Sequence, residues 1–138
     1  MKQTFSKSEK LKSEKQLSAL FTNGHTVTAF PLKLIFMPMD FSDNVKIKVG
    51  VSVPKRRFKK AVDRIRIKRL MREAYRLNKR VLFNNITTQY ALMILYIGDE
   101  KPSYAEVEST MIKLFEKFLD HHSVQQTNED ELNDNPTI

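Results

Sequence analysis

Two spacings of apolar residues alternate along the chain, one typical of helices and one typical of strands. Leu17, Leu20 and Phe21 share one helical face and follow residues 13–16, Ser-Glu-Lys-Gln, which match a capping box at the start of a helix. Residues 30–37 are apolar and extended. The N-terminal part of the chain is therefore predicted to be a short helix followed by a strand.

The regular alternation of residues 45–53 is the clearest strand signal, because β-branched residues occupy every second position. Asp43 and Asn44 supply turn residues just before it, which predicts a hairpin with strand 30–37. The run 88–97 is apolar on both faces and ends at a glycine, so it is predicted to be a buried strand.

Two later segments have the spacing of amphipathic helices. Residues 61–81 place an apolar stripe opposite a basic sector. Residues 103–106 form a second capping box, which opens the last helix. The stripe of helix 61–81 consists of Ile67, Leu70, Met71, Ala74, Leu77 and Val81, and its basic sector of Lys68, Arg69, Arg72, Arg76, Lys79 and Arg80.

The order of these elements predicts an α+β fold. It is a two-layer sandwich in the order α-β-β(-β)-α-β-α, with the helices on one face of the sheet and residues 26–28 as the candidate extra strand. A chain of 138 residues suits one domain, which we place at residues 1–122, with residues 1–12 flexible. Residues 123–138 are polar and acidic and are predicted to be a disordered tail.

All of the excess positive charge lies between residues 45 and 81. This stretch holds 15 basic and 2 acidic residues, whereas the rest of the chain holds 9 and 14, a net of −5 within a total of +8. A solvated helix face normally interleaves acids with bases, but here only Glu73 lies near the basic sector. The local positive field favours a polyphosphate partner, such as a nucleic acid.

Several classes of protein are disfavoured by what the sequence lacks. The chain has no cysteine, which excludes disulfides and thiolate metal sites. Its longest apolar run, residues 90–97, is too short to cross a membrane, and its first residues lack the apolar segment of a secretory signal. The three histidines lack a carboxylate partner or metal-ligand spacing. We therefore expect a cytoplasmic protein with no membrane partner, no catalytic residues and no metal site of its own.

Two segments of the sequence, in this order along the chain, resemble the pattern of a known family. Residues 48–56 are Lys-Val-Gly-Val-Ser-Val-Pro-Lys-Arg, and residues 61–76 are Ala-Val-Asp-Arg-Ile-Arg-Ile-Lys-Arg-Leu-Met-Arg-Glu-Ala-Tyr-Arg. They resemble the bacterial ribonuclease P protein, whose pattern is a Val-Gly-(apolar)-Ser-Val strand, a basic connection and an Arg-Asn-Arg-x-Lys-Arg-x-x-Arg-Glu helix. The resemblance extends over residues 10–120. Ile65 replaces the family's asparagine and falls on the basic side of the helix.

The resemblance implies the protein subunit of a ribonucleoprotein endoribonuclease that removes the 5′ leader of precursor tRNA. The implied partners are ribonuclease P RNA, which carries the chemistry with Mg²⁺, and precursor tRNA. The resemblance also implies a left-handed crossover from strand 45–53 through helix 61–81 to strand 88–97, although general chirality rules favour a right-handed one.

The same resemblance implies two binding surfaces. A cleft between the first helix, the sheet and the basic helix would hold the single-stranded leader, and Leu17, Phe21 and Phe36 match it. Without the resemblance, core packing is the preferred interpretation of Phe21 and Phe36. The implied RNA-binding residues are Lys55, Arg56, Arg57, Arg64, Ile65, Arg66, Lys68, Arg69, Arg72 and Arg76.

Other functions remain open on composition alone. A structural RNA-binding protein, such as a ribosomal component, has the same charge pattern, and the identity of captured RNA would separate the two hypotheses. A DNA-binding regulator is disfavoured, because the basic helix lies between two strands and not in a helix-turn-helix.

Overall fold

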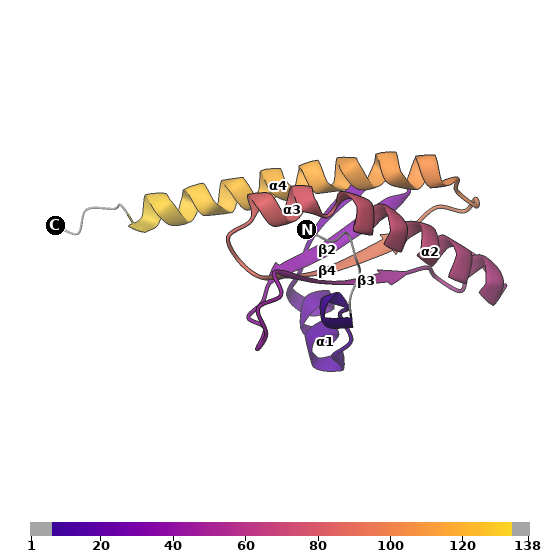
Figure 1. Cartoon of the computed structure of the whole chain (residues 1–138), viewed down its shortest axis with the longest axis horizontal. Coiled ribbons are helices and arrows are strands. Elements are labelled where there is room, and N and C mark those ends of the chain that lie inside the picture. The colour runs from indigo at the N-terminus through magenta and orange to yellow at the C-terminus, as the bar shows by residue number, and fades with distance from the viewer. Residues whose placement is uncertain (1–6, 134–138) are drawn as a thin grey trace.

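The structure is a computed structural model that describes residues 7–133, with side-chain surroundings described as far as residue 122. Four strands and four α-helices follow one another along the chain (Figure 1). They are η1 (Lys7–Glu9, a 3-10 helix), α1 (Glu14–Asn23), β1 (His25–Ala29), β2 (Leu32–Pro38), β3 (Ile47–Ser52), α2 (Ala61–Asn78), α3 (Arg80–Asn85), β4 (Tyr90–Tyr96) and α4 (Tyr104–Asn133).

The strands form one mixed sheet in the order β1-β2-β4-β3. β2 pairs antiparallel with β1 and β4, whereas β3 pairs parallel with β4. The predicted hairpin between strands 30–37 and 45–53 is therefore wrong, because β4 lies between them. β4 is the most apolar strand, and the centre of the sheet is the position that buries both of its faces. The candidate strand at 26–28 is confirmed as part of β1.

Helices cover both faces of this sheet (Figure 1). α2, α3 and α4 lie over one face, where the larger core includes Phe36, Ile67 and Phe118. α1 lies against the opposite face, where Leu20 packs with Met93 in a smaller core. The α+β class is confirmed, but the expectation that every helix packs on one face is corrected for α1.

The apolar stripe of the basic helix is confirmed only in part. Ile67, Met71 and Ala74 are buried, but Leu77 and Val81 are exposed. α2 ends at Asn78 and a separate short helix begins at Arg80, with Lys79 in a right-handed helical conformation between them. Buried residues keep a helical spacing through this junction, at Met71, Tyr75, Lys79 and Leu82, so the buried stripe is offset from the predicted one. Tyr75, which the stripe did not include, is fully buried instead, and burial raises its pKa.

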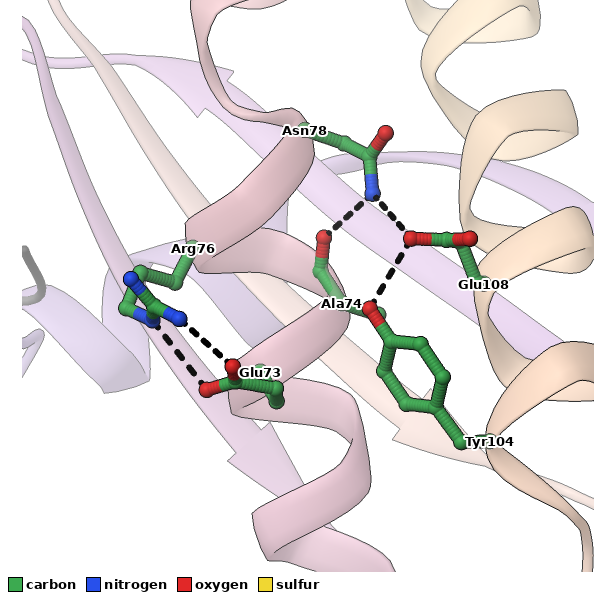
Figure 2. Close-up of polar contacts among 6 residues, drawn as sticks. All are labelled: Glu73, Ala74, Arg76, Asn78, Tyr104 and Glu108. Carbon is green, nitrogen blue, oxygen red and sulfur yellow. Dashed lines mark hydrogen bonds and ion pairs between the residues drawn. The ribbon is translucent and has the colours of Figure 1, made fainter. Parts of the chain in front are cut away.

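A polar contact joins α2 to α4 (Figure 2). The Asn78 amide nitrogen donates to the Ala74 carbonyl (2.8 Å) and to Glu108 Oε2 (3.2 Å). Tyr104 also donates its hydroxyl to Glu108 Oε2, at 2.9 Å. Burial and this hydrogen bond raise the pKa of Tyr104 to about 12. Tyr104 and Glu108 both belong to α4, so the bond from Asn78 to Glu108 is the one of these three that joins the end of α2 to α4.

The ends of the described chain differ from expectation. Residues 7–12 were expected to be flexible, but Leu11 is buried and its N–H donates to the Val49 carbonyl at 3.1 Å. Residues 123–133 were expected to belong to a disordered tail, but α4 continues to Asn133. Residues 1–6 and 134–138 lie outside the described residues. No helix within the described part of the chain is long and apolar enough to span a membrane.

The three histidines contribute to packing near the C-terminal part of α4. The His121 ring lies 4.9 Å from that of His25 and 5.0 Å from that of Phe36. His122 is buried and shares a 2.7 Å hydrogen bond with the Tyr90 hydroxyl. Burial, with the neighbouring His25 and His122, lowers the pKa of His121 below 6.5.

Acidification is therefore expected to destabilise the fold through His121. The folded-state pKa lies below the ordinary value of 6.5, so the unfolded chain takes up the proton first and stability falls as the pH drops through that value. We expect His121→Gln to show a smaller loss of Tm than the unmodified chain between neutral and mildly acidic pH. Thermal unfolding, monitored by circular dichroism at several pH values, measures the dependence of Tm on pH for both proteins. The same dependence in His121→Gln and in the unmodified chain would contradict this role of His121.

Candidate nucleic-acid interface

A cleft of about 290 Å³ opens between the N-terminal segment, α1, the edge of the sheet and α2. Three structural layers meet here, because β3 is the edge strand and α1 and α2 lie on opposite faces. Residues from all of these elements form its surface, which we call the cleft. They are Lys10, Leu11, Lys12, Leu17, Val49, Gly50, Val51, Arg72 and Met93.

One wall of the cleft is the segment of residues 7–12, which we call the N-terminal strap. Lys10 forms a parallel β-bridge with Val49 at the edge of β3, and the Leu11 N–H donates to the carbonyl of the same residue. The strap therefore extends the sheet beyond β3 and covers part of an edge that would otherwise expose unpaired backbone groups.

The floor of the cleft is apolar and close-packed. A Cβ added at Gly50 would lie 2.7 Å from the methyl carbon of Met93, so glycine allows β4 side chains to approach this surface. Met93 is nearly buried, and Leu17 of α1 packs in the same small core. Alternation along β3 explains this floor, because Val49 faces the large core while Gly50 faces Met93 and the Leu11 carbonyl of the strap.

Exposed cations continue from the cleft along α2. Arg66, Arg69 and Arg72 are exposed, and we call these three residues the cationic ridge. Ile65 is 53% exposed on the same helix, as its predicted place on the basic side requires. Lys55 and Arg56, in the connection before α2, are also exposed. Lys68 is half-buried. Guanidinium groups on a rigid helix can donate paired hydrogen bonds to phosphate oxygens.

Three of the predicted RNA-binding arginines are engaged within the protein. Arg57 forms a 2.5 Å ion pair with Asp99. The Arg64 guanidinium is turned back to the carbonyls of Phe58 and Lys59, at 2.7 and 3.0 Å.

Arg76 donates to both carboxylate oxygens of Glu73, at 3.1 and 2.5 Å (Figure 2). This hydrogen-bonded pair lowers the pKa of Glu73. The ten predicted residues therefore do not form a uniform surface, and six of them are exposed, namely the cationic ridge with Lys55, Arg56 and Ile65.

The three residues predicted for the leader cleft are not brought together. Leu17 lines the cleft, whereas Phe21 is 54% exposed on α1 outside its lining. Phe36 is fully buried on the opposite face of the sheet, with its ring 4.9 Å from that of Phe118. The prediction that Phe36 lines the cleft is corrected: it is a core residue. Alternation in β2 is the signal for this, because Leu32, Leu34 and Phe36 share one face.

Sequence reasoning missed other residues of the cleft. Lys10 and Lys12 fall in the segment predicted to be flexible, and Gly50 and Met93 fall in predicted strands, yet all four line the cleft. The spacing of Gly50 within an otherwise β-branched strand was the available signal, since glycine in a strand often marks a close approach of another group. No local pattern indicates that residues 10–12 return to β3.

The described residues contain no group of three or more His, Cys, Asp or Glu side chains that could hold a metal ion. The two acids of the basic stretch 45–81 are both paired, Asp63 with Lys101 and Glu73 with Arg76. These carboxylates do not fit a protein-held Mg²⁺, and the absence of a dedicated protein site stays a prediction.

Comparisons with known proteins agree with one another. The family model for ribonuclease P matches residues 5–119. The chain belongs to the ribonuclease P protein family. It is 37% identical over 112 residues to the ribonuclease P protein component of Porphyromonas gingivalis (strain ATCC 33277), covering 78% of this chain and 81% of that protein. The corresponding protein of Chlorobaculum tepidum is 42% identical over 69 residues, covering 48% of this chain and 45% of that protein.

Solved structures of ribonuclease P proteins share the fold. The Staphylococcus aureus protein matches with a TM-score of 0.64 at 17% identity, covering 80% of this chain and 94% of that one. The Thermotoga maritima protein matches with a TM-score of 0.63 at 19% identity, covering 79% and 96%. The β3-α2-α3-β4 connection joins neighbouring parallel strands, as the family resemblance implies, and its left hand stays a prediction.

Proposed function

We propose that this ribonuclease P protein binds ribonuclease P RNA through the cationic ridge and the 5′ leader of precursor tRNA in the cleft. It acts in the cytoplasm as the protein subunit of the endonuclease that matures tRNA 5′ ends. The protein supplies affinity and screens the charge between two RNAs, while the RNA partner carries the chemistry and the Mg²⁺ that activates water.

The observation that supports this proposal is the distribution of charge around the cleft. Lys10 and Lys12 lie on one wall and Arg72 on another, with an apolar floor between them. A single strand presents phosphates on one side and unpaired bases on the other. Cations at the rims suit the phosphates, and an apolar floor suits the faces of sugars and bases.

Aromatic stacking is not expected on the cleft floor, because none of its lining residues is aromatic. Leu17 and Met93 offer flexible apolar contact to any base, so we expect tolerance of leader sequence. Phe21 is exposed on the same helix as Leu17 and is available to a leader that extends beyond the cleft.

The deciding experiment is cleavage of precursor tRNA by a bacterial ribonuclease P RNA at limiting Mg²⁺, with and without this protein. We expect the protein to restore correct 5′ cleavage, and its benefit to shrink as the leader is shortened. If the RNA works at high Mg²⁺ but the protein never helps at low Mg²⁺, the subunit assignment fails. In that case, Ile65→Asn tests whether the departure from the family pattern is the cause.

Filling the cleft floor is expected to reduce leader binding without unfolding the protein. A valine at Gly50 would collide with the end of the Met93 side chain, which is flexible enough to move but would then occupy the cleft. For Gly50→Val, we expect the preference for precursor over mature tRNA to fall about tenfold, which corresponds to a loss of about 1.4 kcal/mol of binding free energy. Titration of the holoenzyme with precursor tRNA and with mature tRNA measures this preference as the ratio of the two affinities.

A second substitution provides the control for this cleft variant. Met93→Ala in the Gly50→Val background removes the group that would be displaced, so it should recover part of the leader preference. An unchanged preference in Gly50→Val, with an unchanged Tm, would place the leader elsewhere.

A further inference from the structure

A buried ion pair joins the N-terminal strap to the end of α2. The Lys79 ammonium lies 2.8 and 3.1 Å from the two carboxylate oxygens of Glu9, and the two residues are 70 positions apart in the sequence. The Lys79 side chain is only 4% exposed and that of Glu9 14%. The ammonium also lies 5.6 Å from the centre of the Phe83 ring. Two charges are thus removed from water at the junction of α2 and α3.

This ion pair holds the strap immediately before it enters the cleft. Glu9 is the last residue of η1, and Lys10 and Leu11 are bonded to the edge of β3. Lys10, Leu11 and Lys12 then form one wall of the cleft. The strap is therefore fastened at two successive points, first to α2 by side chains and then to β3 by its backbone.

The helix that precedes Lys79 also lines the cleft. Arg72 of α2 lies about two turns before Lys79 and lines the same cleft as Lys10 and Lys12 of the strap. An ion pair between Glu9 and Lys79 consequently ties the two cationic walls to each other. The separation between the lysines of the strap and Arg72 depends on this connection.

Stability alone does not account for a buried ion pair. Desolvation of two charges offsets much of their attraction, and apolar residues of similar size often stabilise a fold as well or better. Two directed hydrogen bonds from one ammonium do, however, fix the position of η1 along the helix in a way that an apolar contact would not.

We infer that Glu9 and Lys79 are positioning residues for leader binding, because their ion pair sets the strap that places Lys10 and Lys12 opposite Arg72. This inference rests on the proposed function. It adds the ion pair that determines how the cleft binds a single strand. The ion pair itself touches no RNA and acts only through the strap.

The test measures two properties of the full-length protein in the holoenzyme. One is the ratio of affinities for precursor tRNA with its leader and for mature tRNA. The other, measured on the free protein, is the hydrogen-exchange rate of the Leu11 amide, which reports whether the strap stays on β3. The variants are Glu9→Gln, the charge reversal Glu9→Lys with Lys79→Glu, and Lys10→Gln with Lys12→Gln.

We expect Glu9→Gln to accelerate Leu11 exchange and to lower the precursor-to-mature ratio about tenfold, as the loss of aligned phosphate contacts requires. Affinity for mature tRNA and for ribonuclease P RNA should stay the same, which a general loss of stability would not allow. The charge reversal should recover both properties, because it restores an ion pair at the same place. The Lys10 and Lys12 variant should lower the ratio while leaving Leu11 exchange slow.

Three results would overturn the inference. The first is fast exchange of the Leu11 amide in Glu9→Gln with an unchanged affinity ratio, which would show that the position of the strap does not affect leader binding. The second is slow exchange with an unchanged ratio, which would show that the ion pair does not hold the strap. The third applies if Glu9→Gln does not fold: it is an unchanged precursor-to-mature affinity ratio in the variant with Lys10→Gln and Lys12→Gln. A chain that shows no leader preference before any substitution would instead refute the proposed function.

Discussion

Replacing Arg69 and Arg72 together by alanine is expected to weaken binding to ribonuclease P RNA and to flatten its dependence on salt. Both side chains are exposed on one face of α2. Each phosphate contact releases condensed counterions, so each loss should reduce the slope of log K against log salt by about 0.7–0.9. We expect a combined reduction of about 1.4–1.8 and an affinity loss of about tenfold or more at low salt.

The salt slope distinguishes this interface from a general effect of charge. Lys113→Ala removes one exposed positive charge from α4, a different helix from the one that carries the cationic ridge, and should change the slope much less than Arg69→Ala. Filter-binding or fluorescence titrations over a series of salt concentrations provide both values. An unchanged slope in the Arg69 and Arg72 variant would move the RNA-binding face to another surface.

Local patterns predicted the secondary structure well, because each depends on neighbours in the sequence. Alternation in residues 45–53 gave β3, and capping boxes at Ser13 and Ser103 marked the starts of α1 and α4. The Ser13 hydroxyl accepts from the Gln16 N–H and the Ser103 hydroxyl from the Glu106 N–H. Such bonds form within one turn, so a sequence motif is sufficient to specify them.

Pairing between distant segments could not be predicted in the same way. Asp43 and Asn44 have turn chemistry, but the choice of β4 as partner for β3 depends on which strand best fills the centre of the sheet. Lys79 fits the basic sector of a helical wheel, yet Glu9 draws it into the interior. Arg64 likewise bonds to carbonyls of the preceding connection. The charge count indicated an RNA-binding surface, whereas tertiary contacts decide which cations remain available to it.

Truncating Phe36 is expected to have the largest effect on stability among the predicted site residues. Its ring is fully buried and lies 4.9 Å from that of Phe118 and 6.3 Å from that of Tyr90, both in edge-to-face arrangements. Removal of a buried phenylalanine side chain costs about 3–5 kcal/mol, because it leaves a cavity as well as losing apolar contact. For Phe36→Ala, this corresponds to a fall in Tm of about 10–20 °C.

A comparison with Phe21 separates a core role from a role in the cleft. Phe21 is 54% exposed, so Phe21→Ala should change the free energy of unfolding by less than about 1 kcal/mol. The milder Phe36→Leu keeps most of the apolar volume and should retain the full preference for precursor over mature tRNA. Loss of that preference in folded Phe36→Leu would return this residue to the leader site. Retained preference with lowered stability would instead confine single-strand binding to the α1 face of the sheet, where Leu17, Gly50 and Met93 form the floor.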